Sequence, residues 1–380
     1  MARIIIASYV IRLPVGGYQS WMLQWLLGFR RLGHEVWFVE KSGWANSCLG
    51  PKTWTGCDDC SAGIMSWSAL LARHGLEKHW CFVDAAGHYH GMTREQIESV
   101  FRTADLFLDH MRVCEWAEES AWAAVTAQVD GEPGMKQMRM ENTAAQGIAM
   151  HQYDRYFSVG LNLGMPDCAV PTAGKVWKPT FDPVVMDLFP PVSPTPGAPF
   201  STIMAWETHA PVVFQGQSYG SKNSEFPAFF DLPSRVSVPL ELALSGPAPL
   251  KRLLAAGWRL RDSARATITF DAWLDYIQSS RGEFAVCKGY FVVMNSGAFS
   301  DRSAAYLASA RPVIMQETGF SAHLPTGRGL FSFRSVDEAA AALDTVDSDY
   351  ARHSRWAREL AHEHLSTDVV LPRVLREVGL

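Results

Sequence analysis

A short polar segment in the last third of the chain carries groups that suit phosphate binding. Residues 295–299 include a glycine and precede a helical pattern, for which Ser300 or Asp301 is a suitable N-cap. The free N–H groups and the positive dipole end of a helix attract anions, and Arg302 adds a forked cation. The pattern predicts an anion site, although an ordinary capped helix with a surface arginine would look the same. The expected contacts are Ser296, Gly297, Ser300, Asp301, Arg302 and Ser303.

Two lysines in the same half extend this prediction. Lys222 closes a glycine-containing stretch, residues 216–222, that follows an apolar strand pattern, and Lys288 directly follows the run 284–287. Loops that follow parallel strands lie at the carboxyl edge of the sheet, where ligands bind. Both lysines are therefore candidate phosphate contacts. A solvated surface lysine is the alternative for Lys222, and the same argument is weaker for Lys288.

Two candidate proton acceptors lie at the end of another apolar run. Asp109 and His110 close the run 104–109 and offer a carboxylate and an imidazole, either of which can take a proton from a hydroxyl. Neighbours on a strand point to opposite faces. Both residues are carried forward as catalytic candidates.

A third candidate loop lies near the N-terminus. Gly16, Gly17 and Tyr18 follow the first apolar run and open a helical pattern. Two glycines permit close approach of the backbone to a ligand. The spacing is not the G-x-G-x-x-G of dinucleotide sites, so that interpretation is poor. A tight turn between strand and helix is the alternative.

These segments require an α/β framework to position them. The apolar run 3–10, a helical pattern that ends at Gly33 and the strand pattern 35–40 form a βαβ unit, which indicates a parallel sheet. Residues 189–199 contain five prolines and interrupt any regular element. Strand and helix patterns restart after this stretch. The expected division is an N-terminal domain over 1–188, a linker over 189–199 and a C-terminal domain over 200–380 that includes the closing helices.

Length and composition limit the function classes. The chain has 380 residues, of which 48% are hydrophobic and 19% charged, so it is neither disordered nor fibrous. A net charge of −5 argues weakly against a protein that clamps nucleic acid. The apolar N-terminal run is far shorter than the about 20 residues that a membrane span needs. A cytoplasmic protein without an integral membrane segment is expected.

The cysteines leave two interpretations open. Seven cysteines, an odd number in a long chain, suit a reducing compartment and free thiols. Cys57 and Cys60 form a C-x-x-C, and together with Cys48 and Cys81 they could hold a structural zinc. The second pair lacks that spacing, so free thiols are favoured and no metal site is predicted.

The candidate anion site is followed in sequence by Ala310-Arg311-Pro312 and then by a loop, Gln316–Phe320. The arrangement resembles the donor-binding segment of GT-B-type glycosyltransferases, and more narrowly a poorly characterised bacterial group of them. Residues 167–172 and 216–226 fit that group too. The resemblance implies two Rossmann-like domains that face each other across a cleft, with the acceptor on the N-terminal side. It also implies that the loop at 16–18 borders the cleft. The residues implied to meet the donor sugar are Gln316, Glu317, Thr318 and Gly319.

The resemblance further implies the reaction. We expect a metal-independent transfer of a sugar from a nucleotide-diphosphate sugar, taken to be a UDP-sugar, to an acceptor hydroxyl, with no other cofactor. The acceptor is a small molecule, a glycan or, with less support, a nucleic-acid base. Glutamates that flank this helix in retaining members are replaced here by Gly297 and Ala305, so the stereochemistry is not assigned. The alternatives are a nucleotide-sugar epimerase or hydrolase and a binding protein without turnover.

Overall fold

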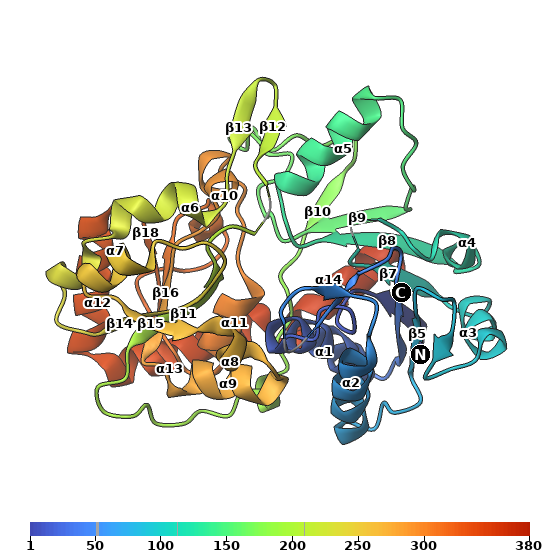
Figure 1. Ribbon diagram of the computed structural model, residues 1–380, viewed down its shortest axis with the longest axis horizontal. Coiled ribbons are helices and arrows are strands. Elements are labelled where there is room, and N and C mark those ends of the chain that lie inside the picture. The colour runs from blue at the N-terminus through green and yellow to red at the C-terminus, as the bar shows by residue number, and fades with distance from the viewer. Residues whose placement is uncertain (51–52, 112, 209) are drawn as a thin grey trace.

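The computed structural model describes residues 1–380 except 51–52, 112 and 209, and contains two large β-sheets that lie beside each other, each with helices packed around it (Figure 1). Residues 3–179 supply the strands of the first sheet, and residues 200–333 supply those of the second. We refer to these parts as the first half and the second half. The α/β prediction is confirmed.

The first sheet has eight strands in the order β10-β9-β8-β7-β1-β2-β5-β6. All neighbouring pairs run parallel except β5 and β6. Ile4, Ile5 and Ile6 are fully buried in β1, as expected for a central strand covered on both faces. The bounds are β1 Arg3–Ala7, β2 Glu35–Lys41, β5 Trp80–Val83, β6 Tyr89–His90, β7 Leu106–Asp109, β8 Val125–Asp130, β9 Arg155–Ser158 and β10 Trp177–Pro179.

Helix α1 joins the two halves. Most of its side chains are buried, because it lies against the first sheet and also contacts helices α9 and α14. A Cβ atom on Gly16 would lie 2.1 Å from the carbonyl oxygen of Thr269, in the second half, so only glycine fits there. The helices of the first half are α1 Gly16–Arg31, α2 Ser61–Arg73, α3 Arg94–Phe101, α4 Ala117–Ser120 and α5 Met135–Ala145.

The second sheet has six parallel strands in the order β15-β14-β11-β16-β17-β18. Its strands are β11 Phe200–Ala205, β14 Leu240–Ser245, β15 Arg259–Asp262, β16 Gly282–Ala285, β17 Val313–Gln316 and β18 Leu330–Phe333. Its helices are α6 Lys222–Glu225, α7 Leu250–Ala255, α8 Ser263–Thr267, α9 Phe270–Ser279, α10 Gly289–Val293, α11 Asp301–Ala308, α12 Val336–Ser348 and α13 Tyr350–Leu360.

The last helix, α14 Thr367–Val378, lies with the first half (Figure 1). The prediction grouped it with the C-terminal domain, and the structure places it against α1 instead. A Cβ atom on Gly28 of α1 would lie 2.5 Å from Leu371, and Arg155 Nε donates to the carbonyl oxygen of Glu377 at 3.0 Å. An amphipathic pattern shows that a helix has a buried face but does not show which sheet covers it. Among the described residues, no helix is long and apolar enough to cross a membrane.

A disulfide corrects the cysteine prediction. Cys48 and Cys60 are bonded to each other across a segment that contains the hairpin β3 Cys48–Leu49 and β4 Gly56–Cys57. The prediction of free thiols is therefore wrong for this pair, and a site made of all four sulfurs is excluded. Cys57 and Cys81 keep free thiols, and Cys81 is buried in β5. The disulfide also removes the argument from cysteine usage for a reducing compartment.

Candidate functional site

A cavity of about 950 Å³ opens between the carboxyl edges of the two sheets and is lined by both halves. Tyr9 and His110 line it just beyond strands β1 and β7, and Lys288 does so beyond β16. The carboxyl edge of a parallel sheet is the usual place for a ligand, because successive loops and helix N-termini converge there. Of the residues that the sequence singled out for chemistry, seven line the cavity: Tyr18, His110, Lys222, Lys288, Ser300, Asp301 and Arg302.

The start of α11 forms the second-half wall of this cavity. The Ser300 hydroxyl accepts a hydrogen bond from the Arg302 backbone N–H at 3.2 Å, so Ser300 is the N-cap. Arg302 Nε donates to Glu283 Oε1 at 2.5 Å, and Nη1 donates to the Ile203 carbonyl oxygen at 3.0 Å. Ser300, Asp301 and Arg302 all line the cavity. A fixed guanidinium thus stands at the positive end of a helix.

Lys222 and Lys288 add positive charge to the same wall. Lys222 begins α6 and is almost completely buried, yet it lines the cavity. Burial, and to a smaller extent the nearby charge of Arg302, lower the pKa of Lys222 to about 7. Lys288 forms an ion pair with Glu132 of the first half, whose other oxygen accepts from the Tyr290 hydroxyl at 3.3 Å. This contact ties the two walls together beside the cavity.

Three predicted contacts shape the loop before α11 instead of lining the cavity. The Ser296 hydroxyl donates to the Phe291 carbonyl oxygen at 3.1 Å. A Cβ atom on Gly297 would lie 2.8 Å from the Asn162 nitrogen, so glycine allows the first half to approach closely. The Ser303 hydroxyl is buried 3.7 Å from the sulfur of Met315. Ser296 and Ser303 thus contribute to packing inside the second half, and Gly297 allows the close contact with the first half.

The four residues that were expected to meet the donor sugar also lie outside the cavity lining. Gln316 accepts from the Cys287 N–H at 3.0 Å and donates to Glu225 at 2.9 Å. Glu317 accepts from the Gly319 N–H at 2.7 Å, and Thr318 donates to the Ala298 carbonyl oxygen at 2.7 Å. These bonds shape the loop after β17, because buried polar groups need partners. The structure does not bring this loop's side chains to the cavity.

His110 faces the cavity from the first half. Its ring lies 5.0 Å from that of Trp21 and 4.9 Å from that of Trp25, near perpendicular to both. Neither ring nitrogen has a hydrogen-bond partner among the described residues, although the side chain is buried. Burial lowers the pKa of His110 to about 3, with a further contribution from Lys136. The lowered pKa favours the neutral imidazole near pH 7, and its two nitrogens are left with unused hydrogen-bonding capacity.

Asp109 is placed differently from its neighbour. Its side chain is 0% exposed and does not line the cavity. One carboxylate oxygen accepts from the Tyr153 hydroxyl at 2.5 Å, and the other accepts from the Met111 N–H at 2.7 Å. Burial raises the pKa of Asp109. Because neighbours on a strand point to opposite faces, only His110 of the predicted pair reaches the cavity, and Asp109 has a structural position.

Asp182 is a cavity residue that sequence reasoning missed. Its Oδ1 accepts the indole N–H groups of Trp21 at 2.7 Å and of Trp25 at 3.2 Å, so it fixes the two rings that hold His110. Burial raises the pKa of Asp182, and the negative charge of Asp301 across the cavity raises it further. No local motif surrounds Asp182, and its partners lie more than 150 positions away in sequence.

The residues at the start of α1 have two different roles. Tyr18 lines the cavity and contacts Tyr9 edge to face, with ring centroids 5.2 Å apart. Gly16 packs against Thr269, and a Cβ atom on Gly17 would lie 3.4 Å from the Trp273 indole nitrogen. The two glycines therefore let α1 approach the second half, while Tyr18 reaches the ligand space.

Solved structures with a similar arrangement share very little sequence with the chain. HepE from Anabaena, solved with UDP-glucose, is 11% identical over 100% of both chains, with a TM-score of 0.58. Sucrose-phosphate synthase from Thermosynechococcus elongatus is 12% identical over 100% of this chain and 99% of that one, with a TM-score of 0.53. An alpha-glucosyltransferase solved with UDP and mismatched DNA is 10% identical over 100% and 99%, with a TM-score of 0.58. The chain has the GT-B glycosyltransferase fold. No protein-family model and no curated protein sequence matches it.

The GT-B fold accounts for the position of the cavity. Each sheet directs its carboxyl edge toward the other half, so Arg302 and Lys222 stand on one wall and His110 on the facing wall. Among the described residues, no group of three or more histidine, cysteine or acidic side chains is arranged to hold a metal ion. The fold identifies the architecture, and the side chains of the cavity must identify the chemistry.

Proposed function

We propose that the protein is a glycosyltransferase that moves a sugar from a UDP-sugar to an acceptor hydroxyl. The observation that carries this proposal is the cavity itself, in which Arg302, Lys222 and the start of α11 face His110. One wall suits a diphosphate, and the other offers an uncharged hydrogen-bonding group. Structures of the same fold that contain UDP or UDP-glucose support the choice of donor.

The second-half wall suits the leaving group of such a transfer. Breaking the bond between the sugar and the diphosphate places negative charge on a phosphate oxygen. Fixed cations and helix amides stabilise such charge, since they need no reorganisation during the reaction. Arg302 is already held by Glu283 and a backbone carbonyl, and Lys222 lies close to it. We propose that these groups do the work that a divalent ion does elsewhere, so that transfer is metal-independent.

The first-half wall suits hydroxyl groups. With a pKa lowered to about 3, His110 is a weak base and acts as a hydrogen-bond partner for a sugar or acceptor hydroxyl. Asp182 lines the same wall, and its raised pKa makes it a stronger base than an ordinary carboxylate. We therefore propose Asp182, instead of Asp109, as the carboxylate that assists the acceptor hydroxyl.

A thermal-shift panel of nucleoside diphosphates and their sugars tests the donor. We expect stabilisation by UDP and by at least one UDP-sugar, because a ligand that binds the native state raises its melting temperature. The stabilising sugar nucleotide is then incubated with the protein, with and without acceptors. Slow release of UDP without an acceptor, accelerated by an acceptor that gains the sugar, supports transfer. No stabilisation by any nucleotide contradicts the proposal.

Product analysis of the same incubations separates the alternatives. A changed sugar that remains attached to the nucleotide identifies an epimerase. Release of sugar at a rate that no acceptor changes identifies a hydrolase. Binding without any turnover identifies a binding protein. Each result therefore assigns one function to the cavity.

A further inference from the structure

The cavity extends along the first half to an exposed tryptophan. Trp44 lines it together with Arg12, Ser47 and Glu115. The side chain of Trp44 is 60% exposed, which is unusual for the largest aromatic residue. Trp44 also lines a second hollow of about 430 Å³, whose other lining residues are Ser42, Gly43, Ala45, Asp58, Asp84, Ala85 and Ala86. One indole ring therefore stands between two hollows that each have the size of a ligand pocket, about 300–1,000 Å³.

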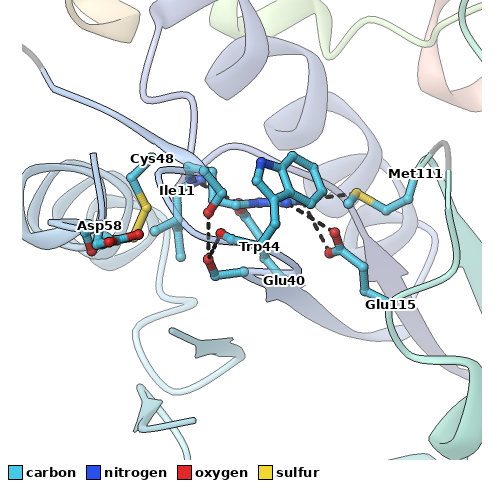
Figure 2. Close-up of polar contacts among 11 residues, drawn as sticks. Ile11, Glu40, Trp44, Cys48, Asp58, Met111 and Glu115 are labelled. Carbon is cyan, nitrogen blue, oxygen red and sulfur yellow. Dashed lines mark hydrogen bonds and ion pairs between the residues drawn. A yellow bond between two sulfur atoms is a disulfide. The ribbon is translucent and has the colours of Figure 1, made fainter. Parts of the chain in front are cut away.

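The indole ring rests on a buried cation. The Arg12 guanidinium lies 5.0 Å from the Trp44 ring centroid, within the range of cation–π attraction. Arg12 is held from its other sides by Glu40 and Glu115, each at 3.0 Å. In Figure 2, Trp44 lies between Glu115 on one side and Asp58 on the other. One face of the ring is thereby occupied by protein, and its exposed surface is left for a ligand.

The segment that carries Trp44 is anchored at several points. The Cys48–Cys60 disulfide begins four residues after Trp44, the Leu49 N–H donates to the Arg12 carbonyl oxygen at 2.7 Å, and the Asn46 N–H donates to Asp58 at 2.5 Å. An exposed aromatic ring that is already held in position loses little conformational freedom when a ligand stacks on it. These contacts favour a preorganised binding platform.

The side chains around this platform favour an uncharged ligand with many hydroxyl groups. Arg12, which lies against the Trp44 ring, is paired with Glu115, and the charged residues that line the second hollow, among those described, are Asp58 and Asp84. Arg12 is balanced by two carboxylates, so the remaining charge of this end is negative and repels anions. Carboxylates accept hydrogen bonds from hydroxyl groups, and an indole ring packs against the C–H face of a sugar ring. This combination matches a neutral carbohydrate better than a nucleic acid, an acidic glycan or a lipid phosphate.

Resting on the proposed transferase function, we propose that the acceptor is a neutral carbohydrate chain. Its terminal sugar lies in the large cavity near His110, a following sugar stacks on Trp44, and the chain continues into the second hollow beside Asp58 and Asp84. A chain can contact the hollow beyond Trp44, which a single sugar in the large cavity does not reach, so a chain should bind more tightly than a single sugar. Affinity is expected to rise with chain length until the second hollow is filled.

A glycan array probed with the full-length protein in the presence of UDP tests this inference. The array carries neutral oligosaccharides of one to six sugars, uronic-acid and sulfated glycans, and single-stranded DNA. We expect retention on neutral chains and none on the acidic probes. Retention on acidic glycans or DNA in preference to neutral chains overturns the inference, as does the absence of binding to every neutral chain.

Calorimetry with the best neutral oligosaccharide and its shorter forms then tests the platform. Trp44→Ala is expected to raise the dissociation constant about tenfold or more, because a stacking partner is lost. Trp44→Phe should recover part of this loss. Trp54→Ala is the matched control, since Trp54 is another exposed tryptophan close in sequence, within the disulfide-closed residues 48–60, and lines neither hollow. An unchanged dissociation constant in Trp44→Ala, or an equal rise in Trp54→Ala, overturns the inference.

Donor measurements on the same variants separate this inference from the proposed function. Stabilisation by a UDP-sugar and its acceptor-free hydrolysis should be the same in Trp54→Ala as in the wild type, because Trp54 lines neither hollow. If donor binds and neutral glycans do not, the acceptor inference fails and the transferase proposal stands. If no nucleotide binds to the wild type, the transferase proposal fails.

Discussion

Arg12 and Arg302 line the same cavity from opposite halves, but their charges are balanced in different ways. Arg12 donates to two carboxylates, Glu40 and Glu115, and is almost completely buried. Arg302 donates to one carboxylate, Glu283, and to a backbone carbonyl. A guanidinium that already faces two carboxylates has little attraction left for an anionic ligand. The comparison indicates that Arg12 supports the fold and the aromatic platform, whereas Arg302 remains available to phosphate.

The surroundings of the two arginines strengthen this difference. Lys222 lies close to Arg302 and adds positive charge to the second-half wall. Near Arg12, burial raises the pKa of Glu40 to about 7 in spite of the opposing charge of Arg12, and Glu115 behaves in the same way. A cation in a cavity is therefore not by itself evidence for an anion site, because the balance of nearby charge decides its role.

The largest expected effect is on stability, in Arg12→Met. Removal of the guanidinium leaves Glu40 and Glu115 buried without their counter-ion, which should lower the free energy of unfolding by about 3–5 kcal/mol. Because ionised buried carboxylates are costly and protonated ones are less so, the loss should grow between pH 6 and pH 8. Urea unfolding at both pH values measures it.

A triple variant is the control for this prediction. Arg12→Met combined with Glu40→Gln and Glu115→Gln removes the unpaired charges and should recover most of the lost stability. If Arg12→Met unfolds at the same urea concentration as the wild type, Arg12 does not have the structural role that the comparison assigns to it.

The next effect is on activity, in the second half. Arg302→Met alone would leave Glu283 buried without a partner, so the variant is made together with Glu283→Gln. We expect donor turnover to fall about 100- to 1,000-fold, as when a preorganised charge-stabilising group is removed, while the urea midpoint changes little. Arg265→Met, at an exposed arginine of the same half outside the cavity, should keep full turnover. Full turnover in the Arg302 double variant would remove Arg302 from the proposed mechanism.

The two halves also differ in how much of each could be predicted from sequence. The proposed anion site of the second half consists of sequence neighbours, since one loop leads into one helix and supplies Ser300, Asp301 and Arg302. Strand and glycine patterns also placed Lys222 and Lys288 at the correct edge of a sheet. The residues at 316–319 do not line the cavity, because a motif gives the position of the backbone and not the direction of each side chain.

The first half brings together residues that are far apart in the chain. Arg12 meets residues 40 and 115, and Asp182 meets Trp21 and Trp25. Such clusters have no local spacing to recognise, because the sheet order brings the segments together. The contact between Gly28 of α1 and Leu371 of α14 shows the same limit. The α/β alternation, by contrast, depends on local periodicity and was predicted correctly.

A smaller effect is expected from the disulfide, which belongs to the first half and is the one disulfide of the described residues. Cys48→Ser with Cys60→Ser removes a constraint on the unfolded chain and should lower the free energy of unfolding by about 2–3 kcal/mol. Urea unfolding of the oxidised wild type and the double variant compares them. Cys57→Ser is the control and should be neutral. Donor binding should not change. A loss of UDP-sugar stabilisation in the double variant would show that donor binding by the second half depends on the disulfide of the first half.

The smallest expected effect is a pH dependence of donor affinity that comes from Lys222. With a pKa lowered to about 7 in the free protein, Lys222 loses its charge as the pH rises through 7, so a UDP-sugar should bind more weakly at pH 8.5 than at pH 6. The groups that set this pKa are Arg302, Cys287, Glu283 and Lys288. A UDP-sugar keeps the same phosphate charge over this range, so the ligand itself does not titrate. Calorimetry should show a weakening of up to about tenfold, because one charged contact is lost.

Two variants assign this pH dependence to its source. Lys222→Arg keeps the positive charge at every pH of the series, so the weakening attributable to Lys222 should disappear. Asp182 also gains negative charge as the pH rises, because its pKa is raised, and Asp182→Asn removes that contribution. If Lys222→Arg has the same pH dependence as the wild type and Asp182→Asn abolishes it, the pH sensitivity of the cavity belongs to the first-half wall. Lys222 would then not contribute positive charge to donor binding, although Arg302 beside it would still do so.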